Sequence, residues 1–174
     1  MKVQQKGPAS GTAMSYPAVA ELKERFVYFA SLENGERENF YGQVVTAEPA
    51  QHTLTLTNVD PAGTGAVVEV ALQGVSLVPH RVTVTVNGQS IGEIAFADKK
   101  TGFARISVPQ SLLVEGANTV TLATAANADP ADVSLVDVVR IGYTHKAVAD
   151  QNVAVVNITG RAGARTIDGF SNNQ

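Results

Sequence analysis

The clearest pattern in the chain is a strict alternation of apolar and polar residues close to its middle. Apolar side chains stand at every second position, with threonine between them: Val82, Val84 and Val86. A period of two is typical of a β-strand with one buried face. Asn87 and Gly88 follow directly, and both residue types tolerate the positive φ angles of a tight hairpin turn. The pattern therefore predicts a β-hairpin, with Ile94 and Phe96 on the buried face of the returning strand.

Similar runs recur along most of the chain, separated by glycine, proline and asparagine. Besides the hairpin, they cover residues 26–30, 38–46, 52–57, 67–75, 104–108, 119–123 and 132–143. Gly74 could mark a bulge in one strand, and Pro109 ends another at the start of a short helical turn. About nine short, regularly spaced strands predict an all-β fold. We expect two antiparallel sheets packed face to face, and a jelly-roll β-sandwich describes that expectation best.

Both ends of the chain lack this pattern. Residues 1–16 are rich in glycine, serine, alanine and glutamine, and we interpret them as a disordered leader outside the fold. Residues 17–145 form the predicted β-sandwich domain, although residues 17–25 have some helical potential. Residues 146–174 read as a linker with trailing strands that could begin a further domain. Because the last pattern stops midway at Gln174, we expect a fragment of a longer protein.

Charge and composition exclude several function classes. The net charge is −3, and lysine and arginine are scattered, which argues against binding to nucleic acid. No apolar run approaches the roughly 18 residues of a membrane-spanning helix, so we expect no membrane insertion. The chain has no cysteine, and this excludes disulfides, thiolate metal sites and cysteine nucleophiles.

The residues that most often carry catalysis show no recognisable arrangement. There is no Gly-x-Ser-x-Gly motif for an activated serine. The histidines His52, His80 and His145 lack the spacing of metal ligands. For His80, beside Pro79 at the start of a strand, we expect a structural or solvent-facing role, and contact with a ligand is the alternative. The sequence therefore predicts no catalytic residue and no enzyme activity.

Asp137 is the most informative acidic residue. Counting by two along its strand places it on the apolar face, beside Leu135 and Val139. A buried carboxylate must be hydrogen-bonded, ion-paired or bound to a metal. Three alternatives stay open: hydrogen bonds from the backbone or Asn118, a bulge that moves Asp137 to the other face, and a structural Ca²⁺ shared with Glu38. Two carboxylates alone fall short of the roughly six to eight oxygens that Ca²⁺ takes, so we expect no cofactor.

Aromatic residues bear on carbohydrate binding, because sugar-binding surfaces commonly stack rings against the ligand. The chain has no tryptophan, and the pattern places Phe26, Phe40 and Phe96 in the core. The candidates for an exposed stacking surface are Tyr41, Phe103 and Tyr143.

Several segments together suggest a family. In order, residues 28–42, 72–75, 86–88, 113–118 and 135–143 resemble a β-sandwich module that lies ahead of the catalytic domain in large bacterial proteins similar to gingipain-type cysteine peptidases. The resemblance covers roughly residues 26–174, and several of these segments are also similar to galactose-binding-like sandwiches. Since that family's catalytic histidine and cysteine lie in its peptidase domain, none is carried over to this chain.

The resemblance implies a role rather than a site. It suggests a non-catalytic accessory module of a secreted or cell-surface protein, which packs against a neighbouring domain of the same polypeptide. The alternative is a module that binds carbohydrate or another cell-surface component. No ligand-binding residue can be assigned from the sequence.

Overall fold

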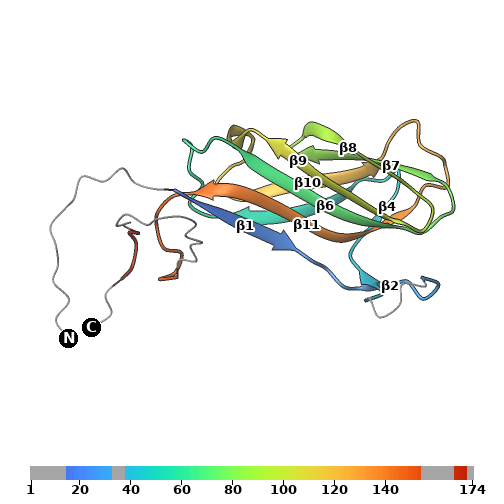
Figure 1. Ribbon diagram of the computed structural model, residues 1–174, viewed down its shortest axis with the longest axis horizontal. Helices are drawn as coiled ribbons and strands as arrows, with labels where there is room; N and C mark the ends of the chain where they lie inside the picture. The colour runs from blue at the N-terminus through green and yellow to red at the C-terminus, as the bar shows by residue number, and fades with distance from the viewer. Residues whose placement is uncertain (1–14, 33–37, 154–166, 172–174) are drawn as a thin grey trace, which may run out of the picture.

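The computed structural model describes residues 15–32, 38–153 and 167–171, and within them two antiparallel sheets pack face to face (Figure 1). One sheet has the strand order β1-β11-β6-β9, with β4 also paired to β11; the other has the order β5-β10-β7-β8. The strands of the first are β1 (Tyr16–Leu22), β4 (Val44–Val45), β6 (Ala66–Gly74), β9 (Thr101–Val108) and β11 (Ser134–His145). Those of the second are β5 (Ala50–Leu56), β7 (Pro79–Val86), β8 (Gln89–Ala97) and β10 (Gly116–Thr124). This architecture confirms the predicted jelly-roll β-sandwich.

The core lies between the sheets, and the period of two predicts its composition. Val82, Val84 and Val86 are fully buried, and the intervening residues of β7 are only partly covered. The opposite sheet contributes equally buried side chains, including Val68, Val70, Leu72, Val139 and Ile141. Fully burying one such aliphatic side chain stabilises the fold by about 1.5–3 kcal/mol. The alternating runs therefore place most of the apolar driving force inside the sandwich.

The turn residues identified in the sequence do what their chemistry predicts. Asn87 and Gly88 have positive φ angles of 50° and 83° between β7 and β8. A short 3₁₀ helix (Gln110–Leu112) follows Pro109. Asn118, which is fully buried, donates from Nδ2 to the carbonyls of Val114 and Gly116 and accepts on Oδ1 from Asn87 Nδ2. These bonds tie the loop before β10 to the hairpin turn.

Gly74 does not mark a bulge. It pairs with Ser134, and the register shift between β6 and β11 lies elsewhere, between Val136 and Val138. A side chain at this position would place its Cβ 2.0 Å from the Asp98 carbonyl oxygen and 2.6 Å from His80 Nε2. Glycine is required here because another part of the backbone approaches it closely.

The start of the sandwich differs from expectation. The stretch with helical potential lies in β1 and the linker after it, because Ala18, Ala20 and Leu22 pack against the core at strand spacing. β1 pairs with β11 from Tyr16↔His145 to Leu22↔Val139. Most of the predicted leader, and residues 154–166 and 172–174 of the predicted linker with trailing strands, lie outside the described residues. No helix in the described part of the chain has the length and apolarity to cross a membrane.

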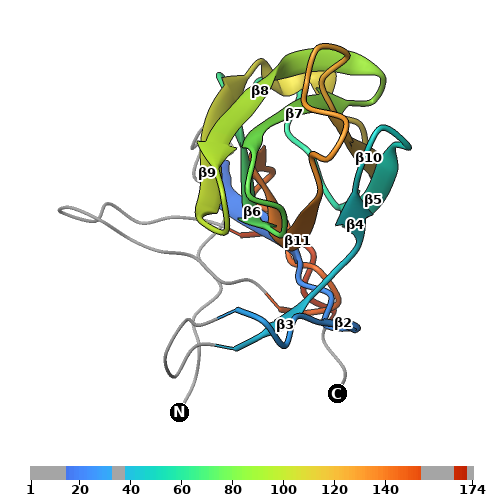
Figure 2. The ribbon, with the colours of Figure 1, turned by 90° about the vertical axis from the view of Figure 1, so that its right-hand side faces the viewer.

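A small hairpin stands apart from both sheets. It consists of β2 (Val27–Tyr28) and β3 (Phe40–Tyr41), and it lies below the end of the sandwich where β4 joins β11 (Figure 2). The sequence predicted longer sandwich strands over residues 26–30 and 38–46. Of these residues, Val44 and Val45 form β4 and pair with β11, and the Gly42 amide donates to the Val136 carbonyl where the chain passes from the hairpin to β4.

Candidate functional site: the hairpin and the cleft beneath it

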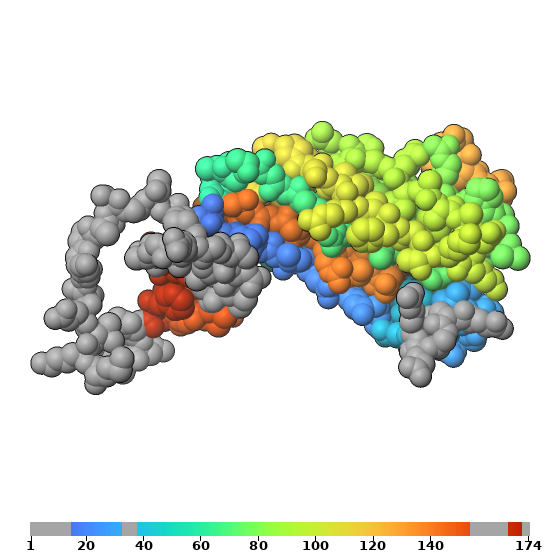
Figure 3. Space-filling view, in the orientation of Figure 1, coloured from blue at the N-terminus to red at the C-terminus, as the bar shows by residue number. Residues whose placement is uncertain are grey.

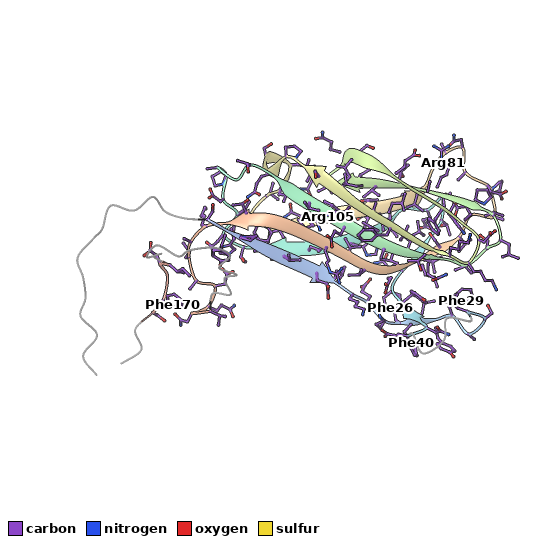
Figure 4. All side chains as sticks on the ribbon, viewed as in Figure 1. Phe26, Phe29, Phe40, Arg81, Arg105 and Phe170 are labelled. Atoms are coloured by element: carbon purple, nitrogen blue, oxygen red, sulfur yellow. The ribbon has the colours of Figure 1, made fainter. Side chains whose placement is uncertain are left out.

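Three aromatic side chains cover the outer face of the β2–β3 hairpin. Phe26, Tyr28 and Phe40 are 61%, 60% and 44% exposed, and the rings of Tyr28 and Phe40 lie 5.0 Å apart. We call these three side chains the aromatic platform. Figure 3 shows the hairpin in blue as a projection at the lower right of the sandwich, and Figure 4 labels Phe26 and Phe40 on it. The platform is an exposed apolar surface that the sandwich core does not explain.

The inner face of the hairpin has a small core of its own. Leu32 and Tyr41 pack against Leu135, which points outward from β11, and Val27 and Phe29 lie at the edge of this cluster. Backbone bonds of 2.9 Å from the Phe26 amide to the Tyr41 carbonyl and from the Phe29 amide to the Asn39 carbonyl close the hairpin. The hairpin is therefore seated on the sandwich, and this seat determines which rings face solvent.

The predicted exposure of the aromatic residues is largely reversed. Phe26 and Phe40 were expected in the core and are exposed, whereas Tyr41 and Tyr143 were candidates for exposure and are buried. Phe103 is exposed on β9, as the pattern allowed. The reversal has a physical cause: both faces of the hairpin segments are apolar, so their alternation alone does not show which face meets Leu135.

Arg25 fastens the hairpin to the sandwich. Its guanidinium is 2.7 Å from Asp137 Oδ1 through Nη2 and 3.0 Å from Glu38 Oε1 through Nε, and Nη1 donates to the Asp137 carbonyl. Its side chain is only 19% exposed, so these charges interact under partial shielding from water. No sequence pattern singles out Arg25, because it lies in the linker between β1 and β2.

Asp137 and Glu38, the two predicted calcium ligands, thus come together around an arginine. Asp137 does not lie on the apolar face, because a bulge shifts the register between Val136 and Val138; its side chain is 39% exposed. The bulge was one of the open alternatives, and Asn118 is not the partner of Asp137. Within the described residues, no group of three or more acidic or histidine side chains could hold a metal. Two carboxylates shared with a guanidinium do not fit the oxygen-rich shell of Ca²⁺.

A cleft of about 490 Å³ lies beneath the hairpin, and we call it the hairpin cleft. Leu32 and Tyr41 line it on one side, and Gln73 and Thr101, from β6 and β9, line it on the other. Its charged lining consists of Lys23, Arg25, Glu38, Lys99, Lys100 and Asp137. Lys99 Nζ lies 5.6 Å from the centre of the Phe29 ring, a distance at which a cation is attracted to an aromatic face. The cleft therefore combines cations, carboxylates and apolar surface.

All three histidines are buried. His80 Nδ1 is 2.5 Å from Asp132 Oδ1, its Nε2 is 2.9 Å from the Asp98 carbonyl, and its ring stacks on Phe96 at 4.5 Å. Asp132 also accepts from the Arg81 amide. This pair ties the loop before β11 to β7, and it is closed to a substrate because His80 and the Asp132 carboxylate are fully buried.

His52 and His145 have different surroundings. Among the described residues, neither ring nitrogen of His52 has a hydrogen-bond partner, and Nδ1 lies 3.8 Å from Glu24 Oε2. Burial lowers the pKa of His52, against the opposing effect of the Glu24 charge. His145 Nε2 lies 2.9 Å from Asp150 Oδ2 at the far end of the sandwich. Burial acts to raise the pKa of Asp150, but hydrogen bonds from Thr57, His145 and Asn58 lower it overall.

Comparison with known proteins places the fold but not a family. No family model matches the sequence, and no curated protein matches it. Dimeric latent PorU from Porphyromonas gingivalis is similar in structure, with a TM-score of 0.61 and 13% identity over 83% of this chain. The match covers 14% of the PorU chain, so this chain spans a small part of its length. This likeness confirms, at the level of the fold, the β-sandwich module that the sequence resembles.

Carbohydrate-binding modules are more distant matches. The CBM36-1 domain of a multidomain xylanase from the hindgut metagenome of Trinervitermes trinervoides has a TM-score of 0.47 and 13% identity; the match covers 72% of this chain and 95% of that domain. A family 35 carbohydrate-binding module from an environmental isolate has a TM-score of 0.47 and 16% identity; the match covers 71% of this chain and 87% of that module.

Proposed function

We propose that this chain is a non-catalytic accessory β-sandwich module of a larger secreted or cell-surface protein. In this proposal it packs against a neighbouring domain of the same polypeptide through the aromatic platform. The observation that carries the proposal is the exposure of Phe26, Tyr28 and Phe40 on one face of a hairpin outside the sandwich core. Contiguous exposed apolar surface marks interaction sites, and aromatic side chains are enriched in them.

The platform is held in place before any partner arrives. Arg25 ties the hairpin to Asp137, and the contact with Leu135 fixes its inner face. A surface that is already ordered loses little conformational entropy on binding. The hairpin is therefore suited to docking a folded partner.

A longer polypeptide is the expected source of that partner. The PorU match extends over 83% of this chain but only 14% of the PorU chain, which is the relation of a module to a large protein. The peptidase character of the neighbouring domain is part of the proposal and follows the resemblance in the sequence.

The charged groups of the described residues support a non-catalytic role. Glu38 and Asp137 are engaged by Arg25, and the His80–Asp132 pair is buried. General acid–base catalysis needs a titrating group within reach of a bound substrate. The chemistry is therefore assigned to another part of the larger protein.

A second candidate function is carbohydrate binding by the platform itself. Tyr28 and Phe40 lie side by side with open faces, which is the arrangement on which a sugar ring can stack. In this second candidate function, the same platform residues bind a sugar instead of a neighbouring domain.

One experiment separates the two functions. The chain and the polypeptide encoded next to it are produced separately, and their association is measured by calorimetry. A Phe26→Ser/Tyr28→Ser/Phe40→Ser variant should lose the association, and Phe103→Ser, which removes an exposed ring from β9, should keep it. Equal binding by both variants, or no association of the unaltered chain, would refute docking through the platform. A glycan array probed with the same proteins tests the second candidate.

A further inference from the structure

We propose that the hairpin cleft binds an acidic saccharide, a short sugar chain that carries a carboxylate. This inference goes beyond the docking proposal and uses the cleft rather than the platform. Either proposal can therefore fail without the other.

The lining of the hairpin cleft holds more positive than negative side chains. Arg25 is engaged by Glu38 and Asp137, and the Lys23 ammonium lies 3.9 Å from Glu38. Lys99 and Lys100 make no ion pair within the described residues. Two lysines of one turn thus line the cleft, in a chain whose net charge is −3. This local excess of positive charge selects for an anionic group.

The two carboxylates of the cleft favour a sugar over a simple anion. Asp137 binds Arg25 through Oδ1, and its Oδ2 makes no hydrogen bond within the described residues. A small inorganic anion would be repelled by the Asp137 and Glu38 carboxylates. A sugar avoids that conflict, because its hydroxyls can donate to the carboxylate oxygens while its own carboxylate binds the lysines.

The uncharged lining of the hairpin cleft suits a sugar ring. Thr101 offers a hydroxyl, and Leu32 and Tyr41 offer apolar surface against which the carbon face of a sugar ring can lie. The volume of about 490 Å³ lies within the range of small-ligand sites, about 300–1,000 Å³. Gln73 is held by hydrogen bonds from its Nε2 to the Lys99 and Gly74 carbonyls, so this wall of the cleft is fixed.

The test uses one acid and its neutral counterpart. ¹⁵N-labelled chain is titrated with trigalacturonic acid and, separately, with its fully methyl-esterified form, and chemical shifts are followed by NMR. The acid should perturb the amides of Gln73, Lys99, Lys100 and Thr101. The ester, which lacks the charge, should bind about tenfold more weakly. Equal binding of acid and ester, perturbations outside the cleft, or no binding of the acid would overturn the proposal.

Two lysine variants complete the test. Lys100→Gln should weaken the affinity for the acid roughly fivefold, because it removes one charged donor from a partly exposed site. Lys146→Gln removes an exposed lysine near the opposite end of the sandwich and should leave the affinity unchanged. Equal losses in the two variants would show a nonspecific charge effect. Loss of binding in the triple platform variant with full binding by Lys100→Gln would place the sugar on the platform and refute the cleft.

Discussion

The sandwich and the hairpin are built from similar residues, yet they bury those residues in different ways. In β7, Val82, Val84 and Val86 face a core shared by two sheets, so every second side chain is covered. In the hairpin, the strands are two residues long, and one face meets Leu135 while the other meets water. Alternation therefore identifies a buried face reliably only where the strand is long and its other face is polar.

The largest effect is expected in the centre of the sandwich. Val84→Asp places an unpaired charge in the fully buried face of β7, and it should lower the free energy of unfolding by more than about 4 kcal/mol or abolish folding. Thr85→Ala, on the partly covered face, should cost less than about 1 kcal/mol. Urea denaturation followed by circular dichroism measures both. Similar losses in the two variants would show that the two faces of β7 do not differ as described.

The second largest effect is expected where the hairpin packs against Leu135 of the sandwich. Leu135→Ala removes a buried side chain under Leu32 and Tyr41, and it should cost about 2–4 kcal/mol through the lost contacts and the cavity. Hydrogen exchange should show the hairpin amides losing protection before those of β7. Uniform loss of protection across the chain would mean that the hairpin is not a separate unit.

Loss of the Arg25 ion pairs with Asp137 and Glu38 should cost less stability than loss of the contact with Leu135. Arg25→Ala leaves Asp137 and Glu38 without their shared partner and should cost about 1–3 kcal/mol. Arg81→Ala is the matched control, because its 2.7 Å pair with Glu93 has both side chains 42% exposed; it should cost less than about 1 kcal/mol. Figure 4 labels Arg81 near the edge of the sandwich, apart from the hairpin. Thermal unfolding measures both variants. An equal cost in the two would show that Arg25 does not fasten the hairpin to the sandwich.

Acid should destabilise the fold through His52. Burial lowers the pKa of His52 below its ordinary value of 6.5, so below that pH the unfolded chain binds a proton that the folded chain resists. The stability gained from keeping His52 neutral is fully present above pH 6.5. It is lost as the pH falls from there toward the pKa that His52 has in the folded chain. The lowered pKa of Asp150 contributes stability separately. That stability is lost as the pH falls below 3.8, the ordinary pKa of this carboxyl group. His52→Leu should flatten the dependence of the melting temperature on pH between about 7 and 5, and an unchanged slope would contradict this assignment.

The smallest effect is expected on the platform. Phe26→Ser replaces a ring that is 61% exposed, so the folded chain loses little buried area. Its cost should stay within about 0.5 kcal/mol in the same urea assay. A cost close to that of Leu135→Ala would show that the ring belongs to the seat of the hairpin.

The architecture and most of its turns could be predicted because they depend on local patterns. The alternation in β7, the Asn87–Gly88 turn and the helical turn after Pro109 all follow from short stretches of sequence. The aromatic platform could not be predicted in the same way, because its exposure depends on which face of the hairpin meets Leu135. That choice is made by a contact between residues far apart in the chain.

The candidate site shows the same limit. The sequence singled out Glu38 and Asp137 and paired them, and the structure does bring them together, but around Arg25. The bulge beside Asp137 adds one residue and moves its side chain to the other face, which no count by two can show. The calcium site therefore stays a prediction that the donor set does not favour.

The pairing of β1 with β11 also has a mechanical consequence. Tyr16 and His145 are directly opposite each other, so the chain enters and leaves the sandwich at the same point. A pulling force applied between these two residues would load the hydrogen bonds of the pair one after another, like a zipper, rather than all together in shear. In an optical trap, the sandwich should then yield at low force, beginning with the detachment of β1, while a pull between Tyr16 and the hairpin should meet greater resistance.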